Sequence, residues 1–173
     1  MATVYASIGT NIERRKHVQA AIDELSRHYG LVESSSVYET PAEGFDGDPF
    51  YNLVSRFQTD EPAAEVNRRF KEIEERWGRE RGGEKFSART LDIDLILYGD
   101  LIINEEGLKL PRDEIEYYAF VLEPLVELEP QGLYTPTGET FVSMWDVANA
   151  NGQMKPAHRL DWIPTASSEQ SAE

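Results

Sequence analysis

Arg89-Thr90-Leu91-Asp92-Ile93-Asp94-Leu95-Ile96-Leu97-Tyr98 reads as a β-strand in which polar and apolar side chains alternate. Because successive side chains of a strand point to opposite faces, the odd-numbered residues from Leu91 to Leu97 are expected on one face. Asp92 and Asp94 then share the other face, with their Cα atoms about 6.5–7 Å apart. This spacing suits two ligands of one pair of hard cations. A bare Asp-x-Asp also fits an edge strand with a solvated polar face, so the surrounding sequence must decide.

The sequence on the N-terminal side of this strand predicts three further strands, at residues 3–8, 31–38 and 50–58. A helix with apolar residues at 18, 22, 25 and 29 separates the first two strands. A second helix, with apolar residues at 66, 70, 73 and 77, precedes the quoted strand. The order strand, helix, strand, strand, helix, strand predicts an α+β fold with a ferredoxin-like βαββαβ core, an antiparallel sheet and helices packed on it.

Beyond the quoted strand the chain is expected to add a C-terminal helical extension. Apolar periodicity predicts one helix near 117–128 and a second near 142–150. Residues 1–163 are expected to form a single domain. Residues 164–173 are rich in serine, glutamate and alanine, and a disordered acidic tail is expected there.

Charge and composition exclude several classes of protein. The formal net charge of -15 over 173 residues argues against general binding of nucleic acid or of anionic membranes. There is no cysteine, hence no disulfide framework, and no apolar run near the 18 residues that a membrane-spanning helix needs. The N-terminus lacks the pattern of a signal peptide, so the cytoplasm is the default expectation for location. A monomer is expected.

About half of the 17 basic residues are concentrated between positions 68 and 89. A locally cationic segment in an acidic protein suits a small polyanion such as a nucleotide. Interleaved glutamates make a solvated helix face the better interpretation of residues 68–76. Glycines replace helix formers between 79 and 89, where binding of an anion is the better interpretation. The residues are Arg68, Arg69, Lys71, Arg76, Arg79, Arg81, Lys85 and Arg89.

Six short motifs in a fixed order carry a resemblance to a known family. They are Tyr5-Ala6-Ser7-Ile8-Gly9-Thr10-Asn11, Ser36-Val37-Tyr38-Glu39-Thr40-Pro41, Phe50-Tyr51-Asn52, Gly78-Arg79-Glu80-Arg81, Ala88-Arg89-Thr90-Leu91-Asp92-Ile93-Asp94 and Ala119-Phe120-Val121-Leu122-Glu123-Pro124-Leu125. In this order and spacing they resemble the 6-hydroxymethyl-7,8-dihydropterin pyrophosphokinase family over about residues 3–150. The resemblance implies transfer of pyrophosphate from ATP to the pterin hydroxymethyl group, with release of AMP.

The resemblance also implies how the nucleotide is held. Asp92 and Asp94 match the carboxylates that hold two magnesium ions against the phosphates of the co-substrate ATP. Guanidinium groups suit phosphate oxygens, and three arginines match catalytic phosphate-binding positions. Other residues match the nucleotide site. The phosphate-binding arginines are Arg79, Arg81 and Arg89, and the further nucleotide residues are Glu74, Lys85 and Arg112.

The pterin site is implied by the same matches. Asn52 matches the amide that reads the pterin edge, and Phe50 and Phe120 match the two rings that sandwich it. Thr40, Pro41 and Ala42 match backbone contacts to the same ring. Taken singly, each residue has a structural alternative, because phenylalanines fill cores and asparagine caps turns.

The chain departs from the family pattern at three places. Ser87-Ala88 stands where the family has glycine before the strand arginine, and Arg112 stands where it has histidine. Tyr118 replaces an arginine two residues before the pterin-stacking phenylalanine. These departures leave open a divergent paralogue that binds a pterin or nucleotide with weak or altered turnover. A third alternative, a phosphohydrolase using Asp-x-Asp alone, lacks further ligands at supportive spacing.

Overall fold

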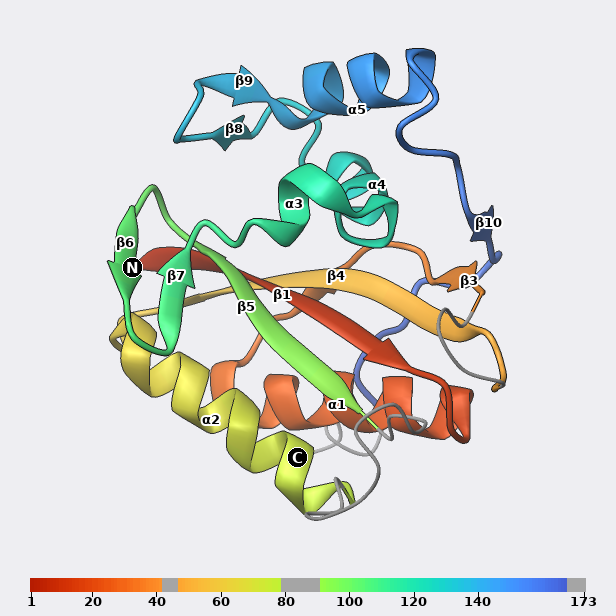
Figure 1. The fold of residues 1–173 in the computed structure, drawn as a ribbon. Helices are drawn as coiled ribbons and strands as arrows, with labels where there is room; N and C mark the ends of the chain where they lie inside the picture. The colour runs from red at the N-terminus through yellow and green to blue at the C-terminus, as the bar shows by residue number, and fades with distance from the viewer. Residues whose placement is uncertain (42–46, 79–90, 168–173) are drawn as a thin grey trace.

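The computed structural model of the protein describes residues 1–41, 47–78 and 91–167, and its centre is an antiparallel β-sheet (Figure 1). Within those residues the strands of the sheet stand in the order β10, β3, β4, β1 and β5, and β2 also pairs with β4. Every one of these pairings is antiparallel. The elements are β1 (Ala2–Thr10), α1 (Arg14–Tyr29), β2 (Glu33–Ser34), β3 (Tyr38–Thr40), β4 (Phe50–Thr59), α2 (Ala63–Arg76), β5 (Asp92–Tyr98), β6 (Ile103–Glu105), β7 (Leu108–Leu110), α3 (Glu114–Tyr117), α4 (Ala119–Leu128), β8 (Leu133–Tyr134), β9 (Glu139–Thr140), α5 (Phe141–Ala150) and β10 (His158–Arg159).

The ferredoxin-like core is confirmed, because β2 and β3 together serve as the second strand of the βαββαβ order. Helices α1 and α2 cover one face of the sheet, and the predicted C-terminal extension, α4 and α5, lies on the other side (Figure 1). The two small hairpins β6–β7 and β8–β9 were not predicted. None of the helices in the described ranges combines the length and the hydrophobicity needed to cross a bilayer.

Two hydrophobic cores lie on opposite faces of the sheet. The larger core lies between the sheet and helices α1 and α2, and the smaller one lies under α4 and α5. The two cores cover both faces of the sheet with helices. A binding site can therefore form only at the edges of the sheet and at the ends of its strands. Central members of the first core are Ile8, Ile22, Leu25, Phe70 and Ile93, and those of the second are Val54, Ile96, Leu122, Leu125 and Phe141.

Strand β5 alternates as predicted only as far as Leu95. Its pairing with β1 shifts register between Tyr5 and Ala6, which face Leu97 and Leu95 respectively, so that β5 carries one extra residue. A bulge of this kind redirects the side chains that follow it. Ile96 and Leu97 therefore both join the core under α4 and α5. The prediction that Leu97 shares the face of Leu91 is wrong.

The predicted strand at 31–38 is two short strands with buried serines between them. Ser35 accepts a hydrogen bond from the Val54 N–H at 3.1 Å, and Ser36 donates through its hydroxyl to Glu127 at 2.9 Å. The serine run suggested a solvated face, but Ser35 and Ser36 are both buried. They are tolerated in the interior because each has a polar partner there.

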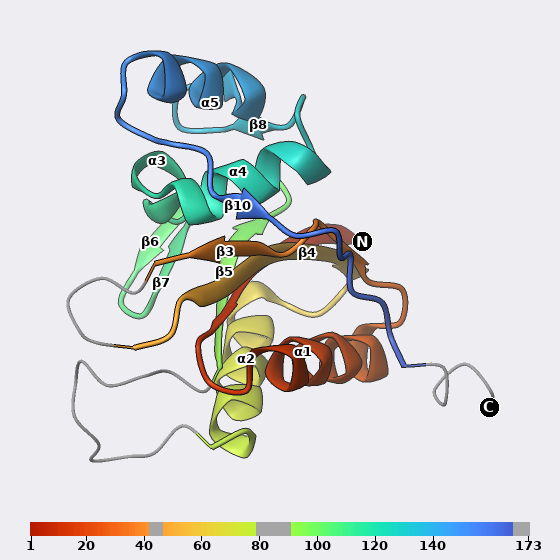
Figure 2. The ribbon, with the colours of Figure 1, turned by 90° about the vertical axis from the view of Figure 1, so that its right-hand side faces the viewer.

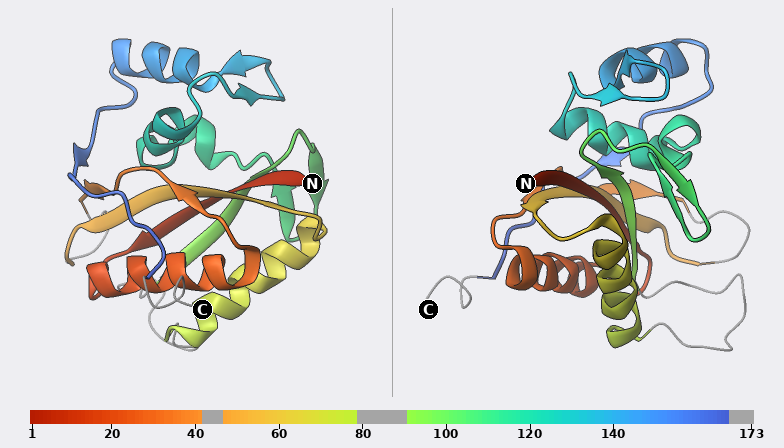
Figure 3. Two further views of the ribbon diagram at one scale, coloured as in Figure 1. Left: turned by 180° about the vertical axis from the view of Figure 1, so that it is seen from behind. Right: turned by 90° about the vertical axis from the view of Figure 1, so that its left-hand side faces the viewer.

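The C-terminal segment returns along the edge of the sheet and then descends beside α1 (Figures 2 and 3). β10 pairs with β3, and Val37 donates its N–H to the Trp162 carbonyl at 3.0 Å. Gln19 of α1 donates to the Thr165 carbonyl at 2.7 Å, and Ser167 donates its hydroxyl to Asp23, also of α1, at 2.7 Å. Residues 164–167, which composition assigned to a disordered tail, thus lie against α1. Residues 168–173 lie outside the described residues.

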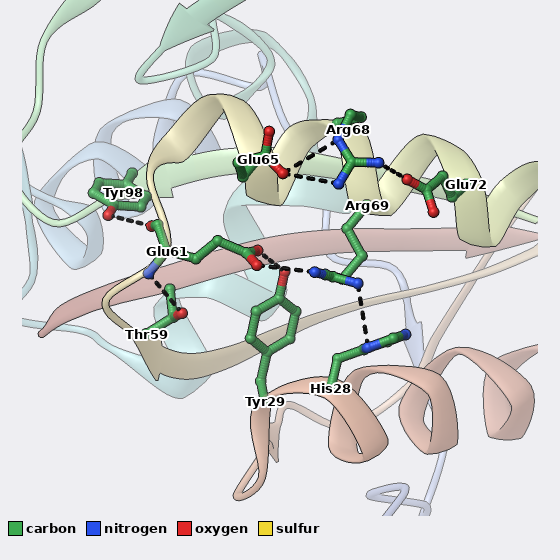
Figure 4. Close-up of polar contacts among 9 residues, drawn as sticks. All are labelled: His28, Tyr29, Thr59, Glu61, Glu65, Arg68, Arg69, Glu72 and Tyr98. Atoms are coloured by element: carbon green, nitrogen blue, oxygen red, sulfur yellow. Dashed lines mark hydrogen bonds and ion pairs between the residues drawn. The ribbon is translucent and has the colours of Figure 1, made fainter.

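A polar network joins the C-terminal end of α1 to the N-terminal end of α2 (Figure 4). Glu61 accepts hydrogen bonds from the Tyr29 hydroxyl at 2.6 Å and from Arg69 at 2.9 Å. Tyr98, at the end of β5, donates to the Glu61 carbonyl at 2.6 Å. The network therefore ties β5 to both helices at the end of the strand remote from Asp92.

The interpretation of residues 68–76 as a solvated helix face holds for Arg68, whereas Arg69 pairs with Glu61 before the helix and Arg76 with buried Glu24 of α1. Arg68 pairs with Glu65 and Glu72 one turn away on each side (Figure 4). Exposed pairs of this kind contribute only about 0.3–0.5 kcal/mol each. Lys71 is different, because it also reaches the acidic pair described next.

Candidate active site

Asp92 and Asp94 open strand β5, which ends the sheet on one side. They pair with Gly9 and Ser7 of β1, and both lie on the face opposite Ile93, as predicted. The Asp94 side chain is 37 % exposed, so its carboxylate is open to a ligand from solvent. The sheet thus presents two carboxylates on the same face at its edge.

Glu74 holds the backbone between the two aspartates. Its side chain is only 2 % exposed, and its Oε2 accepts the N–H of Ile93 at 2.8 Å. A strand at the end of a sheet has N–H groups without a strand partner, and Glu74 supplies the acceptor at this position. The resemblance assigned Glu74 to the nucleotide pocket. In the structure its contacts include the peptide that joins the two candidate metal ligands.

Within the described ranges, two cationic side chains lie near Asp94. Lys71 Nζ is 3.9 Å from Asp94 Oδ1 and 3.8 Å from Glu74 Oε1. The guanidinium of Arg112 has its pKa raised, first by hydrogen bonds to Glu114 and, more weakly, by the charge of Asp94. The site therefore carries both signs of charge, as binding of a metal together with phosphates requires. Lys71 was missed as a site residue, and the only signal was its place one helical turn before Glu74.

Asn52 is held in a fixed orientation between two strands. It is buried in β4, and its Nδ2 donates to the Thr40 Oγ1 of β3 at 2.7 Å. Across the sheet it faces Gly9 of β1, where an added Cβ would lie 2.8 Å from Asn52 Oδ1. A side chain at position 9 would therefore displace the Asn52 amide. The structure thus brings together Asn52 and Thr40, two residues of the predicted pterin site.

The Gly9→Ala variant is expected to raise the KM for the pterin about tenfold, the equivalent of about one lost hydrogen bond. The added methyl group forces the Asn52 amide away from Thr40. The KM for ATP serves as the internal control and should change little, whereas the thermal unfolding midpoint should fall, because a buried hydrogen bond is lost. Steady-state kinetics with each substrate varied in turn checks this. An unchanged pterin KM would separate Asn52 from pterin binding.

The three aromatic residues singled out by the sequence come from different elements. Phe50 begins β4, where it pairs with Thr40, and Phe120 is the second residue of α4. The Tyr118 ring lies 5.0 Å from that of Phe120, with the planes tilted by 31°. Tyr118 is thus placed beside the ring assigned to pterin stacking. Pro41 is the last described residue before the gap at 42–46.

Several predicted site residues lie outside the described parts of the chain. These are Ala42, Arg79, Arg81, Lys85 and Arg89, as well as the departure Ser87-Ala88.

The described chain is anchored where α2 ends, just before residues 79–90. Buried Glu24 of α1 accepts hydrogen bonds from Arg76 at 2.7 Å and from the Trp77 indole at 2.9 Å. Burial alone would raise the pKa of Glu24, but these hydrogen bonds together lower it. The end of α2 is therefore fixed to α1.

Comparisons with known proteins point to one family. The profile described as 7,8-dihydro-6-hydroxymethylpterin-pyrophosphokinase (HPPK) matches residues 5–130. A 2-amino-4-hydroxy-6-hydroxymethyldihydropteridine pyrophosphokinase of Aquifex aeolicus is 34 % identical over 136 residues, covering 78 % of this chain and 84 % of that protein. One of the same name from Haemophilus influenzae is 33 % identical over 133 residues, covering 74 % and 82 %.

Solved structures are similar in fold. A crystal structure of Plasmodium falciparum HPPK-DHPS superposes with a TM-score of 0.71 at 14 % identity. The match covers 94 % of this chain and 50 % of that one, so the chain spans half of the length of that protein. At this level of identity the similarity concerns the fold alone.

Proposed function

The chain belongs to the 7,8-dihydro-6-hydroxymethylpterin-pyrophosphokinase family, and from this premise we propose that Asp92 and Asp94 hold two magnesium ions against the phosphates of ATP. The reaction is transfer of pyrophosphate from the co-substrate ATP to hydroxymethyldihydropterin in folate synthesis. The observation that carries the proposal is the placement of both carboxylates on one face at the edge of the sheet, with Glu74 holding the peptide between them.

The residues present fit magnesium. It is a hard cation that takes oxygen ligands, and in nucleotide enzymes it is commonly held by one or two carboxylates together with substrate phosphates. Asp92 and Asp94 supply such carboxylates, and Asp94 is open to solvent. Within the described residues no three acidic, histidine or cysteine side chains gather as a metal site. When bound, magnesium neutralises phosphate charge and aligns the attacking and leaving oxygens.

Catalysis then depends on holding the pterin and the ATP phosphates in the geometry that the reaction needs. The pterin hydroxymethyl oxygen attacks the β-phosphorus of ATP, a new O–P bond forms, and the bond from the β-phosphorus to the oxygen bridging the α-phosphate breaks. AMP leaves with that oxygen, and the hydroxyl proton passes to solvent. We assign the nucleotide to Glu74, Lys85 and Arg112, and the transferred phosphates to Arg79, Arg81 and Arg89. Cations placed where charge develops are the main source of rate in such reactions.

The pterin end of the site is assigned to Asn52, Phe50 and Phe120, with backbone contacts from Thr40, Pro41 and Ala42. The orientation of Asn52 supports this assignment, because its amide is already fixed by Thr40 and by the space over Gly9. A fixed amide can distinguish the edge of a heterocycle by its donor and acceptor pattern.

We propose further that residues 1–163 act as one pyrophosphokinase domain and that the chain works as a monomer in the cytoplasm. The return of β10 to the sheet supports a single domain. The absence of cysteine favours the cytoplasm. The net charge of -15 favours small-molecule substrates over nucleic acid.

The reaction is tested by product analysis. Incubation with ATP, magnesium and 6-hydroxymethyl-7,8-dihydropterin, followed by phosphorus NMR, should give AMP and the pterin pyrophosphate in equal amounts. ADP or inorganic phosphate as the main product would contradict attack at the β-phosphorus.

A further inference from the structure

Arg112 is joined to strand β5 close to the aspartate pair. Its backbone N–H donates to the Ile96 carbonyl at 3.0 Å, two residues beyond Asp94. The side chain is near enough to Asp94 for that carboxylate to contribute to the raised pKa of the guanidinium. Arg112 therefore lies where a phosphate bound to metal at Asp94 would need a cation.

The guanidinium of Arg112 is already engaged by a carboxylate of its own chain. Nε donates to Glu114 Oε2 at 3.1 Å, and Nη2 donates to the same oxygen. The two side chains are 35 % and 29 % exposed, so the pair is open to exchange with a ligand from solvent. Carboxylate and phosphate oxygens accept hydrogen bonds from a guanidinium in the same geometry.

We propose that Glu114 occupies the phosphate-binding position of Arg112 in the free protein, and that ATP binds by displacing this carboxylate. Glu114 is then a residue that sets the affinity for ATP. The proposal rests on the proposed function for one point only, the placement of the ATP phosphates at Asp94 and Arg112.

The neighbouring acidic side chain of the same turn does not share this position. Asp113 accepts a hydrogen bond from Lys109 at 2.8 Å, and it affects Arg112 only weakly, through its charge. Asp113 therefore provides a matched control, since Asp113→Asn removes the same charge one residue away. A general effect of negative charge would appear in both variants, and displacement of a competing carboxylate only in Glu114→Gln.

The Glu114→Gln variant is expected to bind α,β-methylene ATP with magnesium about two- to fivefold more tightly, the range expected for removing a partly exposed ion pair. Isothermal titration calorimetry measures this directly. In steady-state kinetics the KM for ATP should fall by a similar factor, whereas kcat and the KM for the pterin stay unchanged. Asp113→Asn should leave all of these values near those of the unmodified protein. Glu114→Ala repeats the test without a side-chain amide.

The effect of Glu114→Gln should disappear when Arg112 is replaced with alanine, because no guanidinium then remains to be released. Unchanged or weaker nucleotide binding in both Glu114→Gln and Glu114→Ala would overturn the proposal, and so would equal tightening in Asp113→Asn. If Arg112→Ala does not weaken nucleotide binding, the assignment of Arg112 to the phosphates is wrong as well. Formation of AMP by the unmodified protein tests the reaction independently of these outcomes.

Discussion

Replacing Asp94 with alanine is expected to lower kcat/KM by more than about 100-fold, and Asp92→Ala should do the same. Loss of a residue that only orients a metal ligand costs about 10–100-fold, so loss of a ligand itself should cost more. The fold should survive, because both side chains lie opposite the larger core and neither belongs to it. The backbone at this point is held by Glu74 and by the pairing with β1, which the substitutions leave in place.

Asp100→Ala is the matched control for these variants. Asp100 is exposed just after β5, so the same chemical change is made outside the proposed site. Its turnover should equal that of the unmodified protein, and all three variants should unfold at similar temperatures. Near-normal turnover in either Asp92→Ala or Asp94→Ala would remove that residue from the metal site.

Replacing Glu127 with alanine is expected to lower the free energy of unfolding by about 2–4 kcal/mol. Glu127 of α4 is 17 % exposed and accepts hydrogen bonds from three residues of other elements. The Tyr38 hydroxyl donates at 2.6 Å, Ser36 donates through both its N–H and its hydroxyl, and Arg159 of β10 donates at 3.2 Å. Without the carboxylate, buried donors on Ser36 and Tyr38 lose their acceptor while α4 still covers them.

Chemical denaturation of the Glu127→Ala variant measures this loss, with Glu33→Ala as its control. Glu33 pairs with Arg56 at 3.2 Å, but its side chain is largely exposed, so its removal should cost less than about 1 kcal/mol. Equal stabilities of the two variants would show that Glu127 does not hold α4 and the C-terminal segment to β3.

The element order and the aspartate pair could be predicted because both depend on local patterns. Period-two alternation placed Asp92 and Asp94 on one face of a strand, and helical periodicity identified α1 and α2. The bulge at Ile96 could not be predicted, since Leu95-Ile96-Leu97 is apolar at every position and gives no sign of where the register changes. The position of the bulge is visible only in the pairing of β5 with β1.

Contacts between distant parts of the chain were also beyond the sequence patterns. Buried Ser36 seemed out of place in a core because its acceptor, Glu127, lies about ninety residues further along the chain. The role of Glu74 could not be predicted either, because its partner is the backbone N–H of Ile93 in β5. Composition likewise assigned residues 164–167 to a tail, because the polar partners that fix them, Gln19 and Asp23, belong to α1.

Tyr118 is a departure from the family pattern whose contacts the sequence could not predict. The resemblance indicated a lost phosphate-binding arginine at this position. The structure places the tyrosine ring against Phe120, so Tyr118 makes an aromatic contact at the position where the family has a cation. Among the described residues, the cations near Asp94 are Lys71 and Arg112.

The central claim, that Asp92 and Asp94 hold the metal ions for ATP, is tested most directly by counting bound metal. Manganese can replace magnesium as a countable ion, and protein-bound manganese is measured with α,β-methylene ATP present after free nucleotide is removed by ultrafiltration. The unmodified protein should retain two ions per chain, and Asp94→Asn at most one. Retention of both ions with unchanged affinity in Asp94→Asn would contradict the account.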